Sequence, residues 1–147
     1  MRIGVDYIGV SVGAMIFNDK GELFLSKRSQ NVTNERGCWE IPGGKVDFGE
    51  TLQKAIKREM LEEYGVDLVL LHQLPAQNHL LPKEKQHWVP SCFICKIKGK
   101  IEPKLLEPDK CEAIGWFKLK KLPKPLSEIT KLDLKALKIF KKIIKKL

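Results

Sequence analysis

Glu59, Glu62 and Glu63 lie within a short stretch near the middle of the chain. If this stretch is helical, residues three and four apart share one face, so the carboxylates point the same way. Like charges at that spacing repel one another, and a bound cation relieves the repulsion. Hard divalent ions such as Mg²⁺ take carboxylate oxygens as ligands. The spacing therefore indicates a candidate metal site.

The residues just before this cluster extend the candidate site. Gly43 and Gly44 allow the backbone to approach a ligand closely or to offer a carbonyl to a metal. Glu50 precedes the expected helix and is close enough in sequence to pair with Arg58 and orient its side chain. Mg²⁺ usually keeps several positions for water and for phosphate oxygens of a substrate. Protein carboxylates on one side of the ion thus leave the other side open for a polyphosphate.

The expected positioning element is a helix over residues 51–64. This segment has neither Gly nor Pro, its apolar side chains are interspersed with charges, and Gly65 is placed to end it. Lys54 and Lys57 on the same helix are alternative partners for the glutamates, in which case the acidic cluster is a solvated surface. The charge pattern alone leaves both interpretations open.

Apolar runs predict the other elements. Residues 10–17 and 23–27 flank Asn-Asp-Lys-Gly and predict a hairpin. Thr130 and Asp133 are placed as a capping box for a final helix over residues 130–147. Strands mixed with helices predict an α/β or α+β domain, with helices over a mixed sheet and one domain over residues 1–147. Further strands are expected at residues 38–41, 66–74, 88–97 and 113–117, and loops at residues 29–37 and 78–86.

Composition bounds the class of protein. The 147 residues carry 27 Lys and Arg against 18 Asp and Glu, a net charge of +9. Such a surface suits anionic ligands, although a lysine-rich solvated helix face is the more common cause. Cys92 and Cys95 have the spacing of half a zinc site, but on a strand an offset of three sends their side chains to opposite faces. We expect free thiols, a reducing cytoplasm and no membrane contact.

The order of charged residues and glycines around the helix matches a known pattern. Gly44 and Glu50 are separated by five residues, Glu50 and Arg58 by seven, and residues 58–66 read REMLEEYGV. This resembles the Nudix box, Gly-x5-Glu-x7-Arg-Glu-U-x-Glu-Glu-x-Gly-U, where U is a bulky apolar residue. Every fixed position matches. The mildest departure is at one of the apolar positions, where Met60 is apolar but unbranched and Ile, Leu or Val is usual. The number of specified positions makes the signal far more specific than a lone glycine motif.

The resemblance extends to both sides of the box. Two segments lie on its N-terminal side: residues 25–28 (LSKR) and residues 39–44 (WEIPGG), the second of which ends at the first glycine of the box. On the C-terminal side, residues 107–112 (EPDKCE) are followed by Trp-Phe at 116–117. These segments are similar to nucleotide-cleaving Nudix enzymes of the MutT type over residues 8–125. The resemblance implies the Nudix fold, an α/β/α sandwich.

The resemblance also implies a reaction and roles for residues. Nudix enzymes add water to a phosphorus of a pyrophosphate, which bound metals assist by neutralising charge and positioning the nucleophile. Arg58 and Glu50 would fix the geometry of the metal ligands. The implied ligands of Mg²⁺, or of Mn²⁺, are Gly44, Glu59, Glu62 and Glu63.

Residues outside the box carry further expectations from the resemblance. The acceptor of the water's proton is expected to be Glu112, with Glu107 as second choice and Glu59 as an alternative. Arg28 is expected to contact phosphate, unless it is a solvated surface arginine. Trp88 is expected to stack on a base, unless it packs in the core. Lys110 is a further candidate neighbour of the substrate.

The expected activity is hydrolysis of a nucleoside triphosphate, NTP or dNTP, to the monophosphate and pyrophosphate. Cleavage of ADP-ribose or a nucleotide sugar is the alternative enzyme activity. A non-catalytic nucleotide-sensing Nudix domain is the alternative from another class, and the presence of every box glutamate counts against it. Nucleic acid is not expected as a partner because no RNA-binding motif is present. A monomer or a homodimer is expected.

Overall fold

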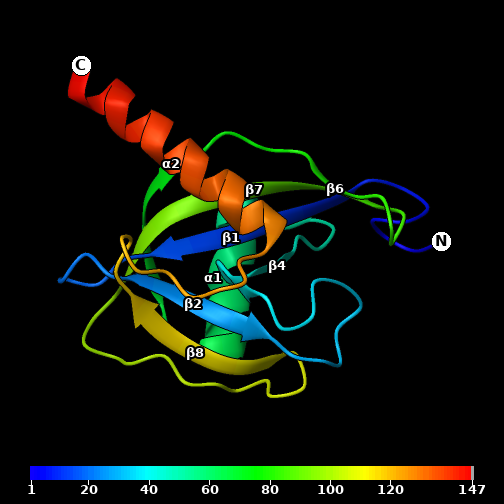
Figure 1. The fold of residues 1–147 in the computed structure, drawn as a ribbon, viewed down its shortest axis with the longest axis horizontal. Helices are drawn as coiled ribbons and strands as arrows, with labels where there is room; N and C mark the ends of the chain where they lie inside the picture. Colours follow the sequence, from blue (N-terminus) through cyan, green and yellow to red (C-terminus); the bar gives the residue numbers. More distant parts are fainter. Residues whose placement is uncertain (147) are drawn as a thin grey trace.

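Within residues 1–146, the part of the chain that the computed structural model describes, eight strands form two sheets (Figure 1). β1 and β7 are parallel, whereas the other pairs are antiparallel, so the larger sheet is mixed. In the larger sheet the order is β4-β1-β7-β5, with β6 also on β7: β1 (Gly9–Ile16), β4 (Gly43–Lys45), β5 (Leu68–Gln73), β6 (His79–Leu81) and β7 (Gln86–Ile97). The smaller, antiparallel sheet has the order β3 (Trp39–Glu40), β2 (Leu23–Arg28) and β8 (Cys111–Phe117).

Two helices complete the layers: α1 (Leu52–Tyr64) and α2 (Glu128–Lys146). Side chains alternate between the faces of a strand, and β1 divides its apolar residues accordingly. Ala14 belongs to the core that α1 covers, whereas Met15 packs in the core that contains Leu137 of α2. The predicted sandwich with helices over a mixed sheet is confirmed, with a second, smaller sheet in addition.

The predicted hairpin between the first two strands is wrong. The turn itself forms, since the Asn18 side chain accepts hydrogen bonds from the amides of Lys20 and Glu22. Beyond one isolated bridge between Phe17 and Leu23, however, β1 and β2 enter different sheets. β1 is already paired on both edges by β4 and β7, and β2 by β3 and β8. Neither strand therefore has a free edge for the other.

The predicted limits of the first helix are confirmed by its caps. Thr51 accepts a hydrogen bond from the Lys54 amide at the start. Gly65 ends the helix with φ of 68°, a left-handed conformation that glycine adopts without a side-chain clash. The buried face of α1 consists of Ala55, Ile56, Met60 and Tyr64.

The capping box predicted for the second helix is wrong. The hydroxyl of Ser127 accepts a hydrogen bond from the Thr130 amide, so Ser127 caps the helix. Thr130 instead accepts a hydrogen bond from the Ile41 amide. Asp133 accepts one from the Gln77 side chain. Thr130 and Asp133 thus bond to residues that are distant in sequence instead of capping the helix. Leu147, the last residue of the predicted helix, lies outside the described residues.

Cys92 and Cys95 confirm the expectation of opposite faces. Cys92 packs in the core under α2 and Cys95 in the core under α1. The four cysteines of the chain are all free. Within the described residues, neither helix combines the length and the apolar character that crossing a bilayer requires.

Burial of Asp133 generates a prediction about stability. Burial raises the pKa of this carboxyl from 3.8 to about 7. Between these values the folded state retains a proton that the unfolded state loses, so stability falls as pH rises, by at most roughly 1.4 kcal/mol per pH unit. Asp133→Asn keeps the acceptor for Gln77 and should remove this decline. Urea unfolding of both proteins at about pH 5 and pH 8 measures how far the free energy of unfolding falls with pH. An equal fall in wild type and in the variant contradicts the prediction.

Candidate active site

Arg58 organises the carboxylates of α1 and the loop before it. Its guanidinium donates to both oxygens of Glu50, with Nη2–Oε1 at 2.6 Å and Nε–Oε2 at 3.0 Å. Nη1 reaches Glu59 at 3.0 Å and Glu62 at 3.4 Å. Hydrogen bonds from Arg58 lower the pKa of Glu50 to about 2. The pairing of Glu50 with Arg58 expected from their spacing is present, and it fixes the loop against the helix.

Gly43 and Gly44 meet different neighbours on β4. A Cβ on Gly44 would fall on the carboxylate of Glu59, so the missing side chain makes room for that carboxylate beside the backbone. A Cβ on Gly43 would fall on the carbonyl oxygen of Val12 in β1. Gly44 therefore shapes the acidic site, whereas Gly43 permits close pairing of the two strands.

Glu63 shows the electrostatic cost of the cluster. Burial, a hydrogen bond with Glu59 and the charges of Glu59 and Glu107 raise the pKa of Glu63 to about 9. The ionised form of Glu63 is thus disfavoured by its surroundings. A divalent cation near these oxygens would favour the ionised form of Glu63 and so lower its pKa again.

The carboxylates do not form a preassembled metal cage. Among the described residues, no three His, Cys, Asp or Glu side chains are grouped closely enough to hold an ion. Glu62 is about half exposed and turns toward Arg58. The donor set is nevertheless made of carboxylate oxygens, which suit a hard divalent ion. The space beside Gly44 and the repulsion at Glu63 fit such an ion, provided that Glu62 moves away from Arg58.

The structure brings Glu107 to this cluster and leaves Glu112 away from it. The loop that carries Glu107 is bound to the end of α1, because the Leu106 amide donates to the Glu63 carbonyl at 3.1 Å. Glu107 pairs with Lys110 at 2.9 Å, and both affect the pKa of Glu63. Glu112 lies on β8 and pairs with Lys27 at 3.2 Å. Of the two loop acids, the structure thus places Glu107 beside the cluster and Glu112 beside Lys27.

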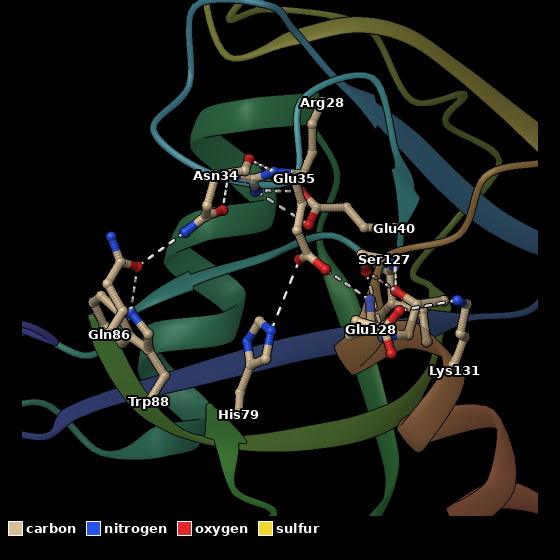
Figure 2. Close-up of polar contacts among 12 residues, drawn as sticks. Arg28, Asn34, Glu35, Glu40, His79, Gln86, Trp88, Ser127, Glu128 and Lys131 are labelled. Carbon is tan, nitrogen blue, oxygen red and sulfur yellow. Dashed lines mark hydrogen bonds and ion pairs between the residues drawn. The ribbon is translucent and has the colours of Figure 1, made fainter. Parts of the chain in front are cut away.

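Arg28 is engaged within the protein. Figure 2 shows its guanidinium between Glu40 and Asn34. Nη1 donates to Glu40 at 3.0 Å, and Nε and Nη2 donate to the backbone and side chain of Asn34. Burial raises the pKa of Glu40, and the positive charge of Arg28 opposes that rise. In this arrangement Arg28 fixes the loop of residues 29–37, which differs from the phosphate contact expected for it.

Trp88 packs against the start of the chain. Its indole lies where a Cβ on Gly4 or Gly9 would be placed, so these glycines allow the ring to lie on the backbone. Its Nε1 donates to Gln86, which also accepts from Asn34 (Figure 2). The indole is thus half-buried against the start of the chain and belongs to neither of the two core clusters.

The loop of residues 29–37 carries contacts that sequence reasoning missed. Glu35 accepts a hydrogen bond from the Glu128 amide at 2.8 Å, at the start of α2. It also faces His79 of β6 at 3.8 Å (Figure 2). Burial lowers the pKa of His79. The loop is polar and has no period, and its partners are distant in sequence, so no local pattern could have predicted this network.

Comparison with known proteins assigns the chain to a family. The family profile described as NUDIX domain matches residues 8–139. A MutT NUDIX hydrolase from Burkholderia pseudomallei, known from a crystal structure, is 38% identical with a TM-score of 0.81, over 89% of this chain and 98% of that one. A MutT protein from Methanosarcina mazei is 28% identical with a TM-score of 0.76, over 94% and 96% of the two chains.

A curated relative is similar over a shorter part of the chain. An RNA pyrophosphohydrolase from Wolbachia pipientis is 37% identical over 60% of this chain and 51% of its own length, so the chain spans about half of that protein. The matching profile covers most of the chain, from β1 into α2, and the structural match to the Burkholderia enzyme covers 89% of it. On these grounds the chain belongs to the Nudix family, among its MutT-like members.

Proposed function

We propose that this chain hydrolyses a nucleoside triphosphate to the monophosphate and pyrophosphate. The observation that carries the proposal is the Arg58 network, which joins Glu50, Glu59 and Glu62 beside the space that Gly44 leaves. All the fixed residues of the box are present, and this network joins most of its charged ones. A domain that only senses nucleotides has no need for that set, which counts against the non-catalytic alternative.

The residues of α1 would hold Mg²⁺ or Mn²⁺ through Glu59, Glu62 and Glu63, with the Gly44 carbonyl. When bound, such an ion neutralises phosphate charge and lowers the pKa of a coordinated water. Arg58 holds the carboxylate of Glu59 in place through the bond at 3.0 Å. Water attacks phosphorus, the bond to the leaving oxygen breaks, and pyrophosphate departs.

Glu107 is the better candidate than Glu112 for the acceptor of the water's proton. A general base must lie within hydrogen-bond reach of the attacking water. Both acids pair with a lysine, but Glu107 is the one whose charge raises the pKa of Glu63, so it lies beside the acidic cluster. The ammonium of Lys110 is close to Glu107 and faces the same acidic cluster. We assign Lys110 a contact with substrate phosphate.

The 5′-triphosphate end of RNA is the second candidate substrate. It presents the same triphosphate as a free nucleotide, and the observation that favours it is the similarity to an RNA pyrophosphohydrolase. The net charge of +9 also favours a polyanion. Four free cysteines accord with a reducing compartment such as the cytoplasm.

The two neighbouring glycines form a matched pair for separating activity from stability. Gly44→Ala should displace the flexible Glu59 carboxylate and lower kcat by roughly 10–100-fold, with stability within about 1 kcal/mol of wild type. Gly43→Ala meets the Val12 backbone and should cost roughly 1–3 kcal/mol of stability. Steady-state hydrolysis and urea unfolding give the two readouts. A Gly44→Ala enzyme with wild-type kcat contradicts the assignment of the site.

Substitution of the two loop acids tests the choice of proton acceptor. Glu107→Gln should lower kcat by roughly 100-fold or more, because general-base catalysis contributes that much. Glu112→Gln should stay within about threefold of wild type, because Glu112 is an exposed partner of Lys27. The reverse pattern of rates would restore the expectation based on sequence.

Glu62→Gln tests the proposed function itself, together with a substrate panel. The substitution removes a carboxylate charge from the metal site and should lower turnover by roughly 100-fold, while the exposed position keeps the melting temperature nearly unchanged. Calorimetry should show Mg²⁺ or Mn²⁺ uptake by wild type and weaker uptake by the variant.

The panel consists of NTPs, dNTPs, 5′-triphosphorylated RNA, ADP-ribose and a nucleotide sugar, with the products identified. Highest kcat/KM for a free triphosphate, with release of pyrophosphate, is expected. Preference for triphosphorylated RNA selects the second candidate, and preference for ADP-ribose rejects both. Absence of hydrolysis and of metal uptake would reject the enzymatic function.

A further inference from the structure

The second half of α2 exposes apolar side chains that the sheet does not cover. Leu137 is buried beneath the helix with 4% of its surface exposed. Farther along, Ile139, Ile143 and Ile144 are exposed to 60%, 53% and 45%. Figure 1 shows the last turns of α2 extending beyond the sheet. The exposed isoleucines are therefore an unpartnered apolar face at the end of a helix that is otherwise anchored.

An open groove continues this apolar face. It has a volume of about 330 Å³ and is lined by Phe17, His72, Leu119 and Phe140, among others. Phe140 belongs to α2 and lies four residues before Ile144, so the two side chains share one side of the helix. The groove and the isoleucines thus form one apolar surface, which we call the α2 tip.

Lysines surround the α2 tip. From Leu134 to Lys146 the helix contains no acidic residue. At about 100° per residue, most of its lysines lie opposite Phe140, Ile143 and Ile144. Ile139 borders these lysines, and Lys141 lines the groove. None of these exposed lysines forms an ion pair within the described part of the chain: Lys135, Lys138, Lys141, Lys142 and Lys145. Exposed lysines also crowd the preceding segment: Lys118, Lys120, Lys121 and Lys124.

We propose that the α2 tip docks on an anionic membrane surface. A helix with apolar residues on one face and lysines on the other lies in the plane of a bilayer interface, with its apolar face in the acyl boundary. Anionic headgroups then compensate the flanking lysines. Such a helix lies on a bilayer without crossing it, which agrees with the lack of a spanning helix among the described residues. The proposal replaces the expectation of no membrane contact.

The chemistry of the α2 tip disfavours the two other classes of partner. A second copy would bring another lysine row against this one, with no acidic residue between Leu134 and Lys146 to compensate it. RNA would compensate the lysines but would leave the isoleucines in water. The catalytic candidates lie on α1, across the larger sheet from α2, so docking leaves them accessible.

Vesicle flotation tests the proposal with the full chain. Wild type should float with vesicles that contain phosphatidylglycerol, much less with pure phosphatidylcholine vesicles, and less as salt rises. Ile143→Ser with Ile144→Ser should lower the bound fraction by at least about fivefold, because apolar burial contributes to interfacial binding. Ile101→Ser is the matched control, since Ile101 is exposed to a similar 51% but lies on the loop between β7 and β8. It should bind like wild type, and circular dichroism should be unchanged for all variants.

Five outcomes overturn the proposal. The first three are absence of wild type from anionic vesicles, equal binding to both kinds of vesicle, and full binding by the doubly substituted chain. The fourth is a concentration-dependent dimer that the serine substitutions abolish while vesicles are not bound, which would assign the α2 tip to a second copy. RNA binding that the serine substitutions leave intact, without vesicle binding, assigns the lysines to RNA and equally overturns it.

Discussion

Crowding of carboxylates on α1 is the constraint on which the rest of the site depends. Glu59 and Glu63 are partly buried beside each other, and burial together with the Glu59 charge disfavours the ionised form of Glu63. Arg58 offsets part of this cost by donating to Glu50 and Glu59. One guanidinium therefore determines where the loop before α1 lies and how the first carboxylate is presented.

Backbone packing places that acidic helix against the sheet. β4 pairs with β1 through glycines that allow close approach, and the second of these glycines leaves room for Glu59. α1 is fixed at its other end by Gly65 and by the loop that carries Glu107. The acids on the helix and on the loop thus meet because both ends of the helix are held by backbone contacts.

Local sequence signals predicted the elements whose limits are set locally. Thr51 and Gly65 end α1 as predicted, because caps act within a few residues. Predictions that needed knowledge of strand partners failed: the first hairpin was expected from its turn, but both strands had their edges occupied. The cap of α2 was misassigned for a related reason, since Thr130 bonds to Ile41, far away in sequence. The short strands β4 and β6 were missed because their pairing with β1 and β7 decides their conformation.

The same distinction separates the parts of the site. The box residues could be identified because their order along one helix carries the information, whereas loop residues depend on which surface the loop meets. Glu112 seemed preferable to Glu107 by its distance from Trp116, but β8 directs it to Lys27. Arg28 likewise donates its hydrogen bonds to Glu40 and Asn34, and the indole of Trp88 donates to Gln86. A polar residue outside a helix motif therefore needs its tertiary partner to be known before a role in substrate binding can be assigned to it.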